Sequence, residues 1–167
     1  LYRNDSLPGS LRFTPMQQHC GWREPSIHGG FAIDLENDGF HELLLAGKRT
    51  LILQRFQPRA SQVDLLATLA MDDPRRSCLP ASIINFDLNL DGRLDIYVGC
   101  QLSSVEIEES TLLNIVFLQN ERGELSPIGD PYEHPLLLTT EGSTLALGAA
   151  DLDGDGLLEL MLSQDSI

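Results

Sequence analysis

The chain is poor in positive charge: 11 lysines and arginines stand against 25 aspartates and glutamates in 167 residues, for a formal net charge of −14. Such an acidic surface repels the phosphates of nucleic acid, and no cluster of basic residues interrupts it. The mixed-charge segment DDPRRS (72–77) is interpreted as a solvated turn. The sequence therefore argues against nucleic acid as a partner.

The chain also lacks any apolar run near the roughly twenty residues of a membrane helix. The segment GSTLALGAADL (142–152) is too short and predicts a strand. No signal peptide is recognised, but a truncated N-terminus would hide one. Because the sequence starts inside an expected strand, LYRND, without Met and stops at MLSQDSI, we expect a piece of a longer protein.

Cysteine is scarce, with three residues, Cys20, Cys78 and Cys100. No Cys-x-x-Cys pair suggests a zinc site. An odd count leaves two arrangements open: one disulfide with one free thiol, or three buried thiols.

Motifs of common enzymes are absent as well. The chain has no Gly-x-Ser-x-Gly elbow and no phosphate-binding loop with its lysine and following helix. Its four histidines are scattered and its one tryptophan, Trp22, is interpreted as a packing residue. We therefore expect no catalytic residues.

Three acidic loops share one pattern: DLENDGFHEL (34–43), DLNLDGRLDI (87–96) and DLDGDGLLEL (151–160). In each, an acid is first, Asp, Asn or Glu third, Asp fifth, Gly sixth, an acid ninth and an apolar residue tenth. Hard cations such as calcium prefer carboxylate and carbonyl oxygens, and glycine permits the sharp turn. One copy would fit a plain acidic turn equally well, but three correlated copies favour metal binding.

The negative charge is concentrated in these loops. They hold eleven acidic residues, and without those eleven the net charge of −14 would be −3. The acidity is therefore not spread as a solvating coat, which supports the metal interpretation.

The loops differ from an EF-hand, which needs a glutamate at position twelve and a helix on each side. Position twelve is apolar here: Leu45, Val98 or Leu162. The runs after the first two loops stop at Gly47 and Gly99, too early for a helix. Each loop is therefore predicted to join two strands.

With these strands, the pattern resembles the FG-GAP or VCBS repeats of integrin α-subunits and of many secreted bacterial proteins. LYRND…RFTP and FLQNERGELSPIGD (117–130) resemble the hairpin of the bacterial repeat. The resemblance covers nearly the whole chain; the middle loop matches best, and the first, with Glu36 and Glu42, matches least. It implies an all-β fold, with β-propeller blades of four-stranded antiparallel sheets.

We expect one repeat region over 1–167, with approximate repeats 1–50, 51–115 and 116–167. Propellers typically close with four to eight blades. The chain holds fewer than three at this spacing, so it is expected to be a fragment of a longer propeller.

The resemblance also implies ligands for about three Ca²⁺ ions, with the seventh residue of each loop acting through its carbonyl and Gly39, Gly92 and Gly156 holding the turns. The implied ligands are Asp34, Glu36, Asp38, Phe40 and Glu42 in the first loop, Asp87, Asn89, Asp91, Arg93 and Asp95 in the second, and Asp151, Asp153, Asp155, Leu157 and Glu159 in the third.

The implied function is a calcium-binding module of a secreted or cell-surface protein, engaged in adhesion or in binding a protein or glycan ligand on a propeller face. Extracellular calcium modules have affinities of about 0.1–1 mM, which fits an extracellular location. Two alternatives stay open: part of a polysaccharide-degrading enzyme built on a calcium-rich propeller, and a purely structural spacer.

Overall fold

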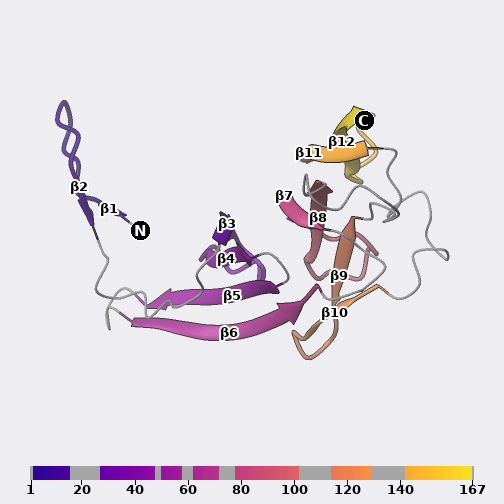
Figure 1. Cartoon of the computed structure of the whole chain (residues 1–167), viewed down its shortest axis with the longest axis horizontal. Coiled ribbons are helices and arrows are strands. Elements are labelled where there is room, and N and C mark those ends of the chain that lie inside the picture. The colour runs from indigo at the N-terminus through magenta and orange to yellow at the C-terminus, as the bar shows by residue number, and fades with distance from the viewer. Residues whose placement is uncertain are drawn as a thin grey trace.

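The computed structural model describes residues 2–15, 27–47, 50–57, 62–71, 78–101, 114–128 and 142–166, and every regular element within these ranges is a β-strand (Figure 1). None of the described residues forms a helix long and apolar enough to cross a membrane. The strands are β1 (Tyr2–Asn4), β2 (Phe13–Pro15), β3 (Ile27–Ile33), β4 (Glu42–Gly47), β5 (Thr50–Gln57), β6 (Gln62–Ala70), β7 (Leu79–Phe86), β8 (Asp95–Gln101), β9 (Ile115–Gln119), β10 (Leu125–Pro127), β11 (Gly142–Ala150) and β12 (Glu159–Ser166).

The described strands form two four-stranded and two two-stranded sheets, all antiparallel. The four-stranded sheets have the orders β3-β4-β5-β6 and β7-β8-β9-β10, so neighbours in sequence are neighbours in the sheet. The two-stranded sheets are the β1–β2 hairpin and the β11–β12 pair, which Figure 1 shows at opposite sides of the molecule. The predicted all-β fold with four-stranded antiparallel sheets is confirmed and is consistent with propeller blades.

The β7–β10 sheet is packed on both faces. From β8, Ile96, Val98 and Cys100 enter a core shared with the β3–β6 sheet, whereas Tyr97 enters a second core shared with β11–β12. This alternation follows from the two-residue period of a strand. Burial of both faces explains why residues 96–100 of β8 form an unbroken apolar run.

Each acidic loop joins the first two strands of its sheet: residues 34–41 lie between β3 and β4, 87–94 between β7 and β8, and 151–158 between β11 and β12. The predicted strand–loop–strand arrangement is therefore confirmed.

The sheets are offset from the sequence repeats by two strands. The first four-stranded sheet takes β3 and β4 from the predicted repeat 1–50 and takes β5 and β6 from the next. Each predicted repeat thus contributes strands to two sheets. The boundaries of the repeats themselves stay a prediction.

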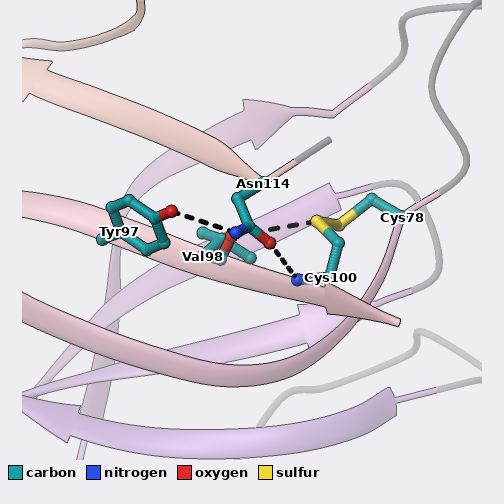
Figure 2. The surroundings of a disulfide bond; sticks show 5 residues. All are labelled: Cys78, Tyr97, Val98, Cys100 and Asn114. Carbon is teal, nitrogen blue, oxygen red and sulfur yellow. Dashed lines mark hydrogen bonds between the residues drawn. A yellow bond between two sulfur atoms is a disulfide. The ribbon is translucent and has the colours of Figure 1, made fainter. Parts of the chain in front are cut away.

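A disulfide joins Cys78, just before β7, to Cys100 in β8 (Figure 2). Of the two arrangements that the cysteine count left open, the structure has the one that includes a disulfide. Cys20 and Trp22 lie outside the described residues. Beside the disulfide, buried Asn114 accepts the Cys100 backbone N–H at 2.9 Å and donates to the Tyr97 hydroxyl at 3.0 Å. These bonds satisfy polar groups that would otherwise be costly to bury.

Candidate metal centre

All three acidic loops fold around the carboxylate of their first residue. Oδ2 of Asp34, Asp87 and Asp151 accepts the backbone N–H of the sixth-position glycine at 2.9, 2.8 and 3.0 Å, respectively. The carboxylate therefore turns toward the inside of the loop, where it fixes the tight turn.

The fifth and ninth residues are turned inward in the same way. Oδ1 of the fifth-position aspartate accepts the seventh-position N–H at 2.8, 3.0 and 2.8 Å in the three loops. The ninth-position acids, Glu42, Asp95 and Glu159, accept the second-position N–H at 3.0, 3.0 and 2.6 Å. A carboxylate has about four lone-pair sites, so these bonds leave capacity for a cation.

Two positions in each loop have left-handed backbone. The sixth-position glycines have φ of 84°, 85° and 90°, as the sequence predicted for residues that hold the turn. The fourth position is also left-handed, with φ of 53° at Asn37, 60° at Leu90 and 81° at Gly154. Sequence reasoning missed this second position. Glycine and asparagine, the residue types that most readily adopt this conformation, occupy the position in two loops as Gly154 and Asn37, but leucine occupies it in the second loop as Leu90.

The third loop gathers the tightest carboxylate group. Asp151, Asp153 and Glu159 each offer an oxygen within 4.8 Å of the others, and they are the described residues that form such a set. Within the described ranges, no arginine or lysine is paired with these three carboxylates. The fourth predicted carboxylate, of Asp155, lies outside this set. Three converging oxygens on an exposed turn match the ligand chemistry of a hard divalent cation.

In the second loop, side chains of the same loop partly neutralise the negative charge of Asp91. Its Oδ2 accepts the Arg93 guanidinium at 2.6 Å and the Asn89 amide at 2.9 Å. Desolvation raises the pKa of Asp91, but the hydrogen bonds from Asn89 and Arg93 and the Arg93 charge outweigh it and lower the pKa below its ordinary value. A cation in this loop would compete with these donors.

Asp95, the ninth residue of the second loop, is buried at 1% exposure. Burial raises the pKa of this carboxyl, while the backbone N–H groups of Gln119 and Leu88 oppose the rise. The Gln119 N–H bonds Oδ1 at 2.9 Å and ties the loop to β9. The remaining cost of burying this charge is one that a nearby cation would reduce.

The first loop already contains a cation, the guanidinium of Arg55 on β5. Its Nη2 lies 2.6 Å from Glu36 Oε1 and 2.8 Å from Glu42 Oε1, and its Nε donates to the same Glu42 oxygen at 3.0 Å. The hydrogen bonds to Glu36 and then Glu42 raise the pKa of Arg55 above its already high ordinary value. Two predicted metal ligands are thus engaged by a side chain, and the first loop fits a metal less well than the third.

Sequence reasoning assigned no role to Arg55. The segments LILQR (51–55) and VFLQN (116–120) have similar sequences, but the first ends in arginine and the second in asparagine, Asn120. That difference was the available signal. It becomes meaningful only once β5 is seen to lie beside β4, which begins at Glu42.

The apolar side chains at the seventh position are exposed to solvent: Phe40 is 74% exposed and Leu157 is 45% exposed. Neither residue is needed for the core. The role of their carbonyls as ligands stays a prediction.

Comparison with known proteins gives one family. A model of the FG-GAP-like repeat matches residues 87–162, a segment that begins with the second loop, includes the whole third loop and ends in β12. No curated protein and no solved structure matches the chain. Residues 87–162, just under half of the chain, are therefore similar to the FG-GAP-like repeat.

Proposed function

We propose that this chain is a calcium-binding propeller module in which ions hold acidic turns between strands, the turn between β11 and β12 above all. The observation that carries the proposal is the convergence of Asp151, Asp153 and Glu159, with oxygens within 4.8 Å of one another. Carboxylate oxygens, a glycine-assisted turn and freedom from a paired arginine together suit calcium.

The proposed role of the calcium ion is to stabilise the folded chain. Three carboxylates this close repel one another, and a divalent cation between them removes that repulsion while connecting both ends of the loop that joins β11 to β12. Because an unfolded chain has no such arrangement, calcium binds the folded state preferentially and stabilises it by mass action.

The proposal includes a secreted or cell-surface location. The Cys78–Cys100 disulfide supports this, since disulfides persist mainly in oxidising compartments. Calcium is also plentiful enough there to fill weak sites. A protein or glycan that binds the loops of a propeller face is the proposed partner, because binding residues concentrate on loops carried by a rigid scaffold.

We also propose that binding, and not catalysis, is the role of this chain. The three loops use the first, fifth and ninth residues in equivalent hydrogen bonds. A structural role repeated three times accounts for this equivalence better than a unique catalytic pair does.

The first test is thermal unfolding in EDTA and in millimolar calcium. At a calcium concentration of about 100 times Kd, one site adds about 2.7 kcal/mol, which raises Tm by roughly 5–10 °C in a chain of this size. Asp153→Ala should remove most of this rise because it deletes one of the three converging carboxylates.

Glu121→Ala is the matched control, since Glu121 is an exposed acid outside the loops, in the β9–β10 turn. It should keep the full calcium response. A Tm that is the same in calcium and in EDTA for the parent chain would contradict the proposed function.

A further inference from the structure

The first loop differs from the other two in the partner of its ninth-position acid. Glu42 is 1% exposed and its Oε1 accepts two bonds from Arg55, at 2.8 and 3.0 Å. A buried carboxylate is stable only when it is paired and hydrogen-bonded. In the second loop, the corresponding Asp95 oxygen accepts the neutral backbone N–H of Gln119.

The same guanidinium also holds the third-position acid. Arg55 Nη2 is 2.6 Å from Glu36 Oε1 and so bridges the third and ninth residues of the loop. These are the positions that Asp153 and Glu159 occupy in the third loop, where their oxygens converge. A positive charge thus lies between two carboxylates that the repeat pattern would direct to a metal.

The lengths of the acidic side chains in the first loop suit a guanidinium in place of a metal ion. The first loop has glutamate at both positions, whereas the second has Asn89 and Asp95. The longer glutamates allow both carboxylates to meet a guanidinium that reaches across from β5, and the guanidinium presents several N–H groups in a fixed plane suited to carboxylates.

We propose that Arg55 is the resident cation of the first loop, so that this loop closes without metal and the calcium dependence of the chain belongs to the other loops, the third above all. The calcium part of this inference rests on the proposed function. The part concerning Arg55 does not, and the two are tested separately.

The calcium arm compares the third residue of two loops by isothermal titration calorimetry with CaCl₂. Asp153→Ala should abolish one binding site or weaken it at least about tenfold. Glu36→Ala, the matched change at an exposed residue of the first loop, should leave the number of sites and their affinity as in the parent chain. Loss of a calcium site in the Glu36→Ala variant overturns the proposal.

The second arm contains no calcium and therefore stands even if the proposed function fails. In EDTA, Arg55→Met should lower Tm by about 5 °C, because it leaves the buried Glu42 carboxylate without its cation. Arg122→Met, which removes an exposed arginine from the β9–β10 turn, should change Tm little.

A double-mutant cycle in EDTA then isolates the pairing. Glu36→Ala should lower Tm in the parent chain and have a smaller effect in the Arg55→Met background, since the bond between Glu36 and Arg55 is already lost there. Equal effects in both backgrounds, or an Arg55→Met chain as stable as the Arg122→Met control, overturn the proposal.

Discussion

At the scale of single residues, the fourth position of each acidic loop is a point where backbone conformation and residue type can conflict. Leu90 adopts φ of 60° with 63% of its surface exposed, while Gly154 fills the same position of the third loop at 81°. A left-handed conformation costs an L-residue roughly 1–2 kcal/mol. Leu90 gains little from burial to offset that cost.

Leu90→Gly should therefore stabilise the chain by about 0.5 kcal/mol, after the greater freedom of glycine in the unfolded state is subtracted. Chemical denaturation in EDTA measures this without any contribution from metal. A stability equal to or below that of the parent chain would contradict the interpretation.

At the sixth position of the acidic loops, the opposite substitution, from glycine to a residue with a side chain, can be tested. Gly156 has φ of 90°, and a Cβ built on it meets nothing within 4 Å. Gly156→Ala should lower the free energy of unfolding by about 1 kcal/mol through backbone strain alone. If the substitution were neutral, the left-handed backbone would not be the reason for glycine at this position.

At the scale of strands, β11 packs closely against β8 because a glycine faces a threonine. A Cβ on Gly99 would lie 2.7 Å from Cγ2 of Thr144, which is too close for any side chain at that point. Thr144 is fully buried, and within the described residues its Oγ1 has no hydrogen-bond partner. The contact uses the methyl group of Thr144 and gains nothing from its hydroxyl.

Thr144→Val should consequently raise the free energy of unfolding by about 1 kcal/mol, since it keeps the methyl contact and removes a buried polar group without a partner. Thr144→Ser is the control: it keeps the hydroxyl, loses the methyl and should destabilise. Equilibrium denaturation compares the three chains, and a valine variant less stable than the parent would show that the hydroxyl is satisfied.

At the scale of the whole molecule, the two four-stranded sheets share one core. Leu44 of β4 and Ile96 of β8 are both 0% exposed and belong to the same hydrophobic cluster. Because neither sheet can expose its inner face without opening this cluster, the two sheets should unfold together.

Leu44→Ala and Ile96→Ala should each lower the free energy of unfolding by about 2–5 kcal/mol. In both variants, denaturation followed by circular dichroism should show one transition, and hydrogen exchange in β4 and β8 should accelerate in parallel. Two separate transitions, one for each sheet, would contradict a common core.

What the sequence determined by itself is local. The first-position carboxylate of each loop accepts the backbone N–H of the glycine five residues later. That glycine has the left-handed backbone that the turn requires. The apolar runs on both sides of each loop form strands. These features depend on groups close together along the chain, so residue order is enough to predict them.

Only the tertiary structure decided which distant side chains meet these loops. Pairing of β4 with β5 brings Arg55 to Glu36 and Glu42, and stacking of the sheets divides the residues of β8 between two cores. The fold also pairs Cys78 with Cys100, which the cysteine count left open. The physical reason is that the charge or surface a residue meets across a sheet depends on strand register and packing, which the spacing of one motif does not contain.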